Sequence, residues 1–410
     1  MTDSQDFSNL SDRRRMTALI LLTLTVFAIG TAELLPMGLL LPIATETKVS
    51  ISTTGMLVTG YALGVVIGGP VLSALAGRLP RKTVLSVFLL VFIIGSIVCT
   101  AAPSYGLLLA GRVISSLAHG TLFGMIVVTA KNLAQPGKEG RSIALVGSGL
   151  TVSVILGAPL GTLLGQHLGW RFPFLVISLL SAAALLGIMK QLPPLPRSKG
   201  GSLKGQLRIV SRPDFLLVLL ITIFGTGGTF AGFTYITPIL ERITGFSSDS
   251  VTIILLVFGA GSLLGNIAGG SLADKRLMPT LFGGLILLAV SMAIFTWSSH
   301  SKVAAVISVF IWGVAAYSII PALNMLVLKK AGDAQELAST LNISAFNLGN
   351  AIGAFIGGLV IDSTLGLAAV PWVASIVTLL GIVLAIWSEI LEKNRKYDRF
   401  PENPFENRTA

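Results

Sequence analysis

Residues 83–102 read TVLSVFLLVFIIGSIVCTAA, and none of these 20 residues carries a charge. A helix of about 20 apolar residues is long enough to cross the hydrocarbon core of a bilayer. Arg81 and Lys82 stand directly before the run and Pro103 follows it, so the run is bounded on both sides. The stretch therefore predicts a membrane-spanning helix. Barrel strands do not fit, because they run for about 9–11 residues and alternate in polarity.

The same pattern recurs along the chain and predicts twelve spans in all. Each run is apolar over a spanning length and ends at a charge, a proline or a glycine cluster. The runs are 17–42, 51–76, 83–102, 105–128, 142–168, 172–189, 215–240, 251–273, 278–297, 303–328, 337–361 and 367–390. The first run follows three arginines, has no small-residue cleavage site and is longer than a signal-peptide core, so we expect it to be retained as a helix.

The composition and the charge agree with a membrane protein. Of the 410 residues, 53% are hydrophobic and 11% are charged, whereas a soluble chain is about 25% charged. With the N-terminus placed in the cytoplasm, 24 of the 29 Lys and Arg fall in cytoplasmic segments and 4 lie in or beside the outer loops. This follows the positive-inside rule and predicts that both termini are cytoplasmic. The net charge of +11 then reflects topology and contact with anionic lipid, and no nucleic-acid partner is expected.

Two halves of six spans echo each other at an offset of 197 residues. SALAGR at 73–78 falls on GSLADK at 270–275, and Leu-Gly at 168–169 falls on Leu-Gly at 365–366. The expected layout is a tail at 1–16, a six-helix bundle at 17–190, a basic linker at 191–212, a second bundle at 213–391 and a tail at 392–410. Parallel repeats of this kind are typical of transporters, which bind their substrate near the membrane midplane between the halves.

This layout and several motifs resemble the major facilitator superfamily over nearly the whole chain. GSLADK with the following arginine is similar to the family's loop motif, LLAGRVISSLAHG at 108–120 to its fourth-helix motif, and GLTVSVILGAPLGTLLG at 149–165 to the fifth-helix motif associated with antiporters. FAIGTAELLPMGLL at 27–40, with AHG and GWRFPF, resembles the bacterial AraJ-like arabinose/sugar efflux permeases within the twelve-span drug:proton antiporters. The resemblance implies an all-α membrane protein with 12 transmembrane helices in two pseudo-symmetric six-helix bundles.

The resemblance also assigns roles to the loop and fifth-helix motifs. In the family the loops that carry Arg78, Arg81, Asp274, Lys275 and Arg276 steady the outward-facing state. The first copy departs from the pattern, because a glycine stands where the acidic residue is expected. In the family the fifth-helix stretch seals the interface between the halves and favours antiport. It contains the small and helix-bending residues Gly157, Pro159 and Gly161. Ordinary close packing would involve the same contact.

Glu33 is the acidic residue that lies well inside a predicted span. A charged side chain at this depth is costly, so it normally faces a cavity and has a partner. Apolar surroundings favour the neutral form of a carboxyl group, which suits a proton carrier. A fixed ion pair, or a capped kink near Pro36, is the structural alternative.

Two basic side chains on one face of the fourth span are the other candidates for proton coupling. Arg112 lies at a depth similar to that of Glu33 and would pair with it if the first and fourth spans are neighbours. Capping of loose backbone carbonyls is the alternative for this arginine. His119 follows seven residues later on the same face and could relay a proton, or serve as a neutral hydrogen-bonding group.

The second half offers amides and aromatics in place of charges. The position equivalent to Glu33 is Phe230. A wall of this kind suits a neutral or weakly polar substrate. The candidate substrate-binding residues are Tyr235, Trp312, Tyr317, Asn324, Asn347 and Asn350.

These features predict a proton-coupled efflux antiporter in a bacterial inner membrane, exporting a small polar or amphipathic solute by alternating access. We expect a monomer in the bilayer, driven by the proton gradient, with no metal, cofactor or catalytic residues, because no nucleotide-binding, metal or triad motif is present. The alternatives are a multidrug or chloramphenicol-type exporter, an uptake symporter, and a membrane enzyme or receptor.

Overall fold

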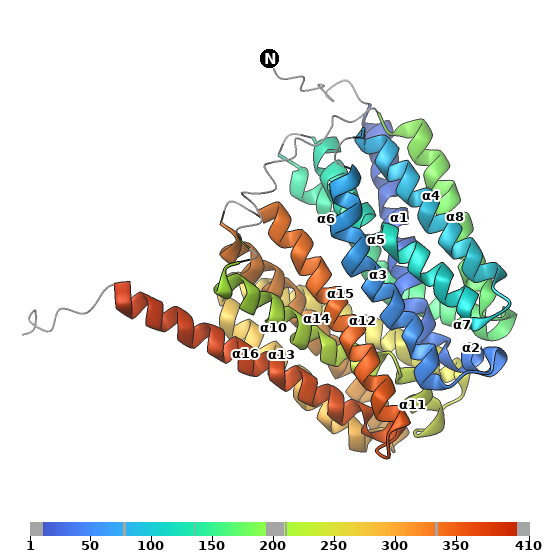
Figure 1. The fold of residues 1–410 in the computed structure, drawn as a ribbon, viewed down its shortest axis with the longest axis vertical. Helices are drawn as coiled ribbons and strands as arrows, with labels where there is room; N and C mark the ends of the chain where they lie inside the picture. The colour runs from blue at the N-terminus through green and yellow to red at the C-terminus, as the bar shows by residue number, and fades with distance from the viewer. Residues whose placement is uncertain are drawn as a thin grey trace, which may run out of the picture.

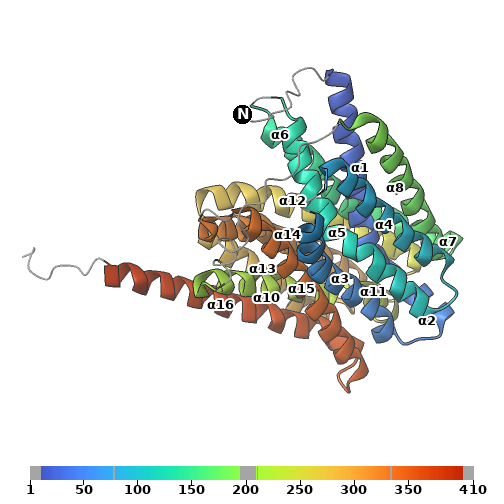
Figure 2. The same ribbon diagram turned by 45° about the horizontal axis from the view of Figure 1, so that its top comes forward.

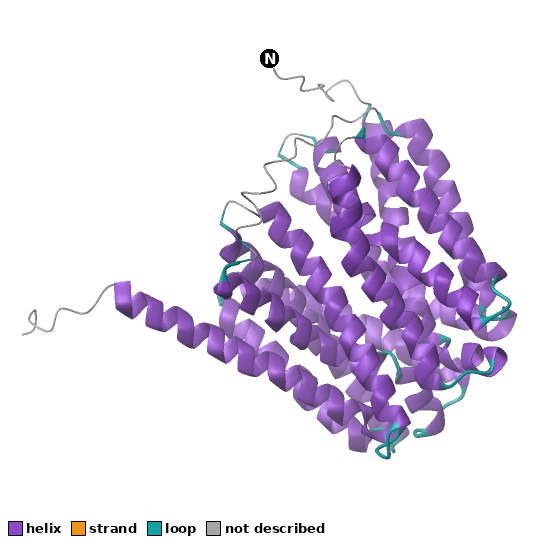
Figure 3. Ribbon diagram, viewed as in Figure 1, coloured by secondary structure: helices purple, strands orange, loops and turns teal. Residues whose placement is uncertain are grey.

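The computed structural model describes residues 11–76, 79–135, 137–193, 209, 211–332 and 335–399. Helices and short connections make up the described residues, and no strand occurs among them (Figure 3). Twelve helical segments are long and apolar enough to cross a membrane, so the predicted all-α class and the twelve spans are confirmed. Of the predicted linker at 191–212, only 191–193, 209, 211 and 212 are described, and Arg78 lies outside the described residues.

The helices follow the predicted runs closely but extend past several of their ends. In the first half they are α1 (Asp12–Gly38), α2 (Leu40–Thr47), α3 (Ile51–Ala76), α4 (Arg81–Ala101), α5 (Tyr105–Leu133), α6 (Glu139–Val152), the π-helical turn η2 (Ser153–Gly157), α7 (Ala158–Leu168) and α8 (Arg171–Gln191). In the second half they are α10 (Pro213–Phe233), α11 (Ile236–Arg242), α12 (Ser248–Lys275), α13 (Leu277–Ser298), α14 (Lys302–Ala331), α15 (Gln335–Asp362), the 3₁₀ turn η3 (Leu367–Ala369) and α16 (Val370–Arg399).

The helices form two groups, α1–α8 and α10–α16, which lie side by side (Figure 1). Buried apolar side chains fall into two clusters, one drawn from residues 18–192 and the other mainly from residues 209–385. Met37, Val58 and Val154 of the first group belong to the second cluster, so they mark where the halves meet. We call the side on which α1 begins and α16 ends the termini side, and the side that carries α2 and α11 the opposite side.

One span of each half is broken near the opposite side, where a single helix was predicted. Pro42 has no N–H to donate to the carbonyl of Gly38, and α1 ends at Gly38. Pro238 likewise cannot donate to the carbonyl of Thr234, and α10 ends one residue earlier. The short helices α2 and α11 continue each span after the break. The two halves therefore share the same irregularity at equivalent places, as a repeat requires.

The halves are joined on the opposite side and diverge toward the termini side, where the ends of α1 and α16 lie far apart in both views (Figures 1 and 2). The side-chain contacts that cross between the halves on the opposite side are Ser52–Asp362 at 2.7 Å, Thr237–Met37 carbonyl at 2.8 Å, His167–Asp249 at 3.0 Å and Thr252–Gln166 at 3.3 Å. On the termini side, the ion pair of Lys330 with Glu392 at 2.8 Å stays within one half. This arrangement is closed on the opposite side.

Candidate functional site

Glu33 lies on α1 where the two halves approach each other. Its side chain is only partly buried. The amide nitrogen Nδ2 of Asn350, on α15 of the other half, donates to its Oε1 at 3.4 Å. This long hydrogen bond is a direct link between the carboxyl group and the second half. The structure therefore brings together one predicted proton-coupling residue and one predicted substrate-binding residue.

Arg112 does not form the predicted ion pair with Glu33. Its guanidinium is almost fully buried and donates to two main-chain oxygens of α1, the carbonyl of Ala32 and, at 3.3 Å, the carbonyl of Glu33. Among the described residues, no ion pair involves the Glu33 carboxylate. The reason lies in α1 itself: Pro36 cannot donate to Ala32, so that carbonyl is free to accept from the arginine. The carbonyl-capping alternative is the geometry observed.

Tyr61, on α3, is a site residue that the sequence did not reveal. Its ring lies under the guanidinium of Arg112, 4.0 Å from the guanidinium carbon to the ring centroid, and its centroid is 5.8 Å from that of the His119 ring. The hydroxyl of Tyr61 and Nδ1 of His119 are buried and have no hydrogen-bond partner among the described residues. A phenol inside a span was the available signal, but it is too common to single out one tyrosine.

Two asparagines of α15 present unpaired oxygens beside this cluster. Asn347 and Asn350 lie three residues apart, and each is about 95% buried. Asn347 donates through Nδ2 to the carbonyl of Ile343 at 3.0 Å. The Oδ1 atoms of both asparagines have no partner within the described part of the chain. Buried acceptors of this kind are costly unless a ligand or another group satisfies them.

The other candidate substrate residues lie at three separate places. Trp312 is buried in an aromatic cluster with its Nε1–H unpaired among described residues, and Tyr317 packs edge-on against Phe258 of the same cluster. Tyr235 stands in the break between α10 and α11, and its hydroxyl donates to the carbonyl of Ala354 at 2.9 Å. Asn324, on α14, is exposed, and its side-chain oxygen accepts from Asn342 Nδ2 at 2.8 Å.

The glycine stripe of the fifth span packs inside the first half. A Cβ on Gly157 would lie 2.1 Å from Oγ1 of Thr31, and one on Gly161 would lie 2.7 Å from a methyl carbon of Leu35, both on α1. The contact between the halves is made by another face, where Gly259 of α12 lies against Ile155. The fifth-helix stretch therefore does reach the other half, but through Ile155 and not through Gly157 or Gly161. Pro159 follows the π-helical turn η2, a distortion of the kind that prolines permit.

The loop motif of the second half is exposed. Asp274 and Lys275 end α12 and Arg276 follows them, all three on the termini side and open to solvent. Arg81 begins α4 on the same side. Among the described residues, no hydrogen bond or ion pair joins these three side chains to the first half, so the contact between halves that the resemblance implies at this loop is absent from this arrangement.

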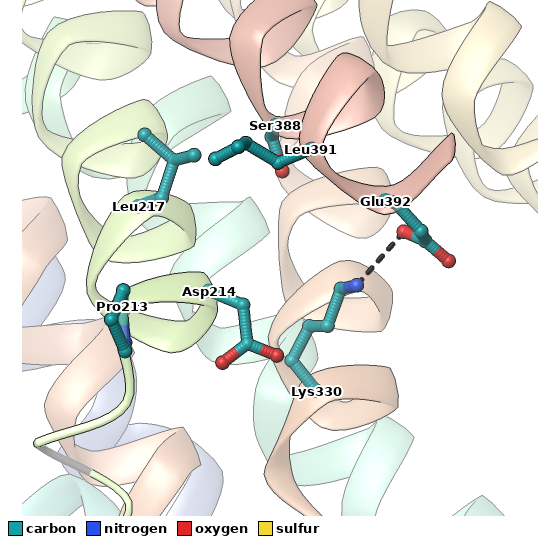
Figure 4. A pocket seen from close by; sticks show the side chains of 7 residues that line it. All are labelled: Pro213, Asp214, Leu217, Lys330, Ser388, Leu391 and Glu392. Carbon is teal, nitrogen blue, oxygen red and sulfur yellow. Dashed lines mark hydrogen bonds and ion pairs between the residues drawn. The ribbon is translucent and has the colours of Figure 1, made fainter. Parts of the chain in front are cut away.

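A small hollow, partly open to solvent, lies within the second half at the termini side (Figure 4). Its lining comes from the ends of α10, α14 and α16: Pro213, Asp214, Leu217, Lys330, Ser388, Leu391 and Glu392. Lys330 is paired with Glu392, and Asp214 with Arg212 at 2.9 Å. The hollow is distant from Glu33 and its charges satisfy one another, so it is not the central site.

Comparison with known proteins decides the family. The profile described as Major Facilitator Superfamily matches residues 19–343. The chain belongs to the Major Facilitator Superfamily. Its relatives include the inner membrane transport protein YdhP of Escherichia coli (strain K12), which is 38% identical over 90% of this chain and 95% of that protein. AraJ of the same organism is 33% identical over 85% of this chain and 88% of AraJ.

A chloramphenicol resistance protein of Streptomyces lividans is 30% identical to this chain. The match covers 90% of this chain and 95% of the Streptomyces protein. Among solved structures, a bacterial homologue of the human lysosomal transporter Spinster, in an inward-facing and occupied conformation, has the same fold. Its TM-score is 0.72 at 16% identity, covering 93% of this chain and 98% of that one. The superfamily member described here is thus a multi-pass membrane transporter, as its relatives are.

Proposed function

We propose that this transporter is a proton-coupled efflux antiporter of a bacterial inner membrane, with both termini cytoplasmic. The observation that carries the proposal is the position of Glu33. It is the acidic side chain found well inside a described span, it stands at the contact between the halves, and no described cation pairs with it. A carboxyl group in that position can change its charge without first breaking an ion pair.

In the proposed cycle, Glu33 releases its proton on the cytoplasmic side, which is the termini side of the structure. The ionised carboxylate and the unpaired oxygens of Asn347 and Asn350 then accept hydrogen bonds from a small polar or amphipathic solute, of sugar or metabolite type. Rocking of the halves exposes the site outside, where the solute leaves and a proton binds. The neutral carboxyl returns, because burial of an uncompensated charge at this depth is costly. The gradient drives the cycle in a single chain, without a cofactor.

The neighbouring residues have distinct parts in this proposal. Arg112 supplies a fixed positive charge close to Glu33, and His119 offers a proton relay beside Tyr61. Trp312 and Tyr317 provide aromatic faces against which the apolar part of a solute can stack. Asn324 and Tyr235 lie at greater distance along the second half and would contact the solute only as it passes.

The test compares Glu33→Gln with wild type in proteoliposomes. We expect the variant to lose substrate transport driven by a pH gradient while it retains exchange of labelled for unlabelled substrate. Glu46→Gln is the matched control, because that carboxylate is paired with Arg171 on the opposite side, outside the site. Undiminished gradient-driven transport by Glu33→Gln would remove Glu33 from its role. The direction of flux in everted vesicles separates efflux from uptake by a symporter.

Export of drugs of the chloramphenicol type is the second candidate function. It is favoured by the relative of that name and by the aromatic cluster at Trp312, which suits an amphipathic ring compound. Competition by unlabelled sugars, nucleosides and chloramphenicol-like drugs against substrate-dependent proton flux distinguishes the two. Mass spectrometry of the exported solute would show it unaltered for a transporter and changed for an enzyme.

A further inference from the structure

We infer that Tyr61 is a positioning residue: together with Pro36 it holds Arg112 on the backbone of α1 and so keeps the arginine out of an ion pair with Glu33. The inference rests on the proposed function, in which Glu33 carries the proton. It assigns a role to a residue on a third helix, α3, that belongs to no motif in the sequence. Three contacts carry it.

The first two contacts are the main-chain hydrogen bonds of Arg112. The carbonyl of Ala32 would normally accept from the amide four residues later, and that residue is Pro36, which has none. Arg112 supplies the missing donor through one terminal nitrogen and reaches the carbonyl of Glu33 with the other, at 3.3 Å. Both terminal nitrogens thus donate to backbone oxygens of α1.

The third contact is the ring of Tyr61. The guanidinium carbon lies 4.0 Å from the ring centroid, and both side chains are 1% exposed. An arginine over an aromatic face at this distance is attracted by the ring electrons, more strongly where water is absent. The tyrosine hydroxyl has no partner among the described residues, so the ring, not the hydroxyl, makes the contact. A phenylalanine should therefore serve as well.

The consequence concerns the charge on Glu33. Among the described residues, the titratable groups within electrostatic range of Arg112 or of Glu33 are Tyr61 on α3, Cys99 on α4, His119 on α5 and Tyr317 on α14, and no second acid is among them. An arginine released from its three contacts would be drawn to the one carboxylate nearby, because attraction between charges is strong in a medium of low dielectric. The pair would favour the ionised form, and Glu33 would bind its proton only at lower pH.

The experiment measures protonation of Glu33 directly. Infrared difference spectra of the purified, reconstituted full chain follow the C=O stretch of the protonated carboxyl as pH changes, and the band is assigned by its absence in Glu33→Gln. In Tyr61→Leu we expect the midpoint to fall by about one pH unit or more, an about tenfold loss of proton affinity. Tyr61→Phe should titrate like wild type. Pro36→Ala, which restores the amide donor to Ala32, should shift the midpoint in the same direction as Tyr61→Leu.

The outcomes separate this inference from the proposed function. If Tyr61→Leu titrates like wild type, or if Tyr61→Phe shifts as far as Tyr61→Leu, the positioning role is overturned. If Tyr61→Leu does not fold, the test rests on Pro36→Ala. A midpoint of Glu33 protonation that is unshifted in Pro36→Ala overturns the inference. If Glu33→Gln loses the band but keeps gradient-driven transport, the proposed function fails although the positioning role stands. The pH for half-maximal transport should move with the infrared midpoint in Tyr61→Leu, Tyr61→Phe and Pro36→Ala.

Discussion

The contact between Gly55 and Tyr235 allows a direct test of how the opposite side closes. Gly55 lies in the second turn of α3 and Tyr235 in the break between α10 and α11, so the two halves meet at this point. A Cβ on Gly55 would lie 2.1 Å from the tyrosine oxygen and 2.6 and 2.8 Å from two ring carbons. Ordinary carbon contacts are about 3.5–4.0 Å, so Gly55→Ala requires a displacement of more than about 1 Å.

The tyrosine has no room to absorb that displacement. It is 1% exposed, its hydroxyl is bonded to Ala354, and a Cβ on Gly357 would lie 2.6 Å from the far edge of its ring. The strain therefore falls on the packing of α3 against the second half. Overpacking of this kind costs about 1–3 kcal/mol, which changes an equilibrium between two states by about 5- to 150-fold. We expect Gly55→Ala to shift the population toward the state in which the opposite side is open.

Spin-label distances across the opposite side measure the shift. Labels at exposed Lys48 and Ser247, in a background where the single cysteine Cys99 is replaced by serine, report the separation of the halves. Gly106→Ala is the matched control, because it lies at the same level of the membrane and a Cβ there meets nothing within 4 Å.

The tyrosine itself provides the decisive comparison. In a Tyr235→Leu background all three close contacts are removed, so Gly55→Ala should shift the distances far less than it does in wild type. An equal shift in both backgrounds, or no shift in either, would refute the reasoning that the tyrosine contact controls closure of this side.

Three further predictions concern other contacts. Asn350→Ala removes the hydrogen bond from the second half to Glu33. Because this bond is long, we expect its loss to cost about 1 kcal/mol and to slow gradient-driven transport about fivefold. In Glu33→Gln, which has no gradient-driven transport, Asn350→Ala should have no further effect on it. Hydrogen bonding from Arg171 holds the pKa of Glu46 below its usual value of 4.5. The stability that the ionised Glu46 contributes is therefore present above pH 4.5 and is lost as pH falls through the lowered pKa. The melting temperature below pH 4.5 should depend less on pH in Glu46→Gln than in wild type. Gly149→Ala places a Cβ 2.6 Å from a carbonyl of α1 inside one half. It should cost about 1–3 kcal/mol of stability, seen as a lower melting temperature, without changing the spin-label distances.

The spans and the repeat were predictable because transfer into lipid depends on local composition. A run of apolar residues must become a helix in a bilayer whatever its neighbours are, since each backbone polar group needs a partner. The breaks at Leu39 and Tyr235 were not predicted, although Pro42 and Pro238 stand just beyond them. A proline inside a span can kink, loosen or end a helix, and packing against the other helices decides which.

Glu33 was predictable from its charge alone, but the partner of Arg112 was not. Depth along each helix placed the two side chains at the same level, yet it carries no information on how each helix is rotated about its axis. Arg112 donates to the carbonyl of Ala32 for two reasons. Pro36 leaves that carbonyl without a helical donor, which the sequence shows, and α1 and α5 are rotated so that the arginine faces it, which the sequence does not show. The contact with Tyr61 joins three helices and leaves no local pattern. The same limit explains the fifth span, where small residues indicate a close contact but not which helix makes it.

On the proposed mechanism, the two halves contribute different chemistry to one cycle. The acidic and basic side chains near the centre, Glu33, Arg112 and His119, all belong to the first half, whereas α15 presents the amides of Asn347 and Asn350. Among described side chains, the direct hydrogen bond that carries a charge on Glu33 to the second half is the one from Asn350, and a bound solute can add another. Because the amide can donate to a carboxylate or accept from a carboxyl, it pairs with both states and discriminates little between them. The solute is then the group whose binding depends most on the charge, which is what coupling of solute to proton requires.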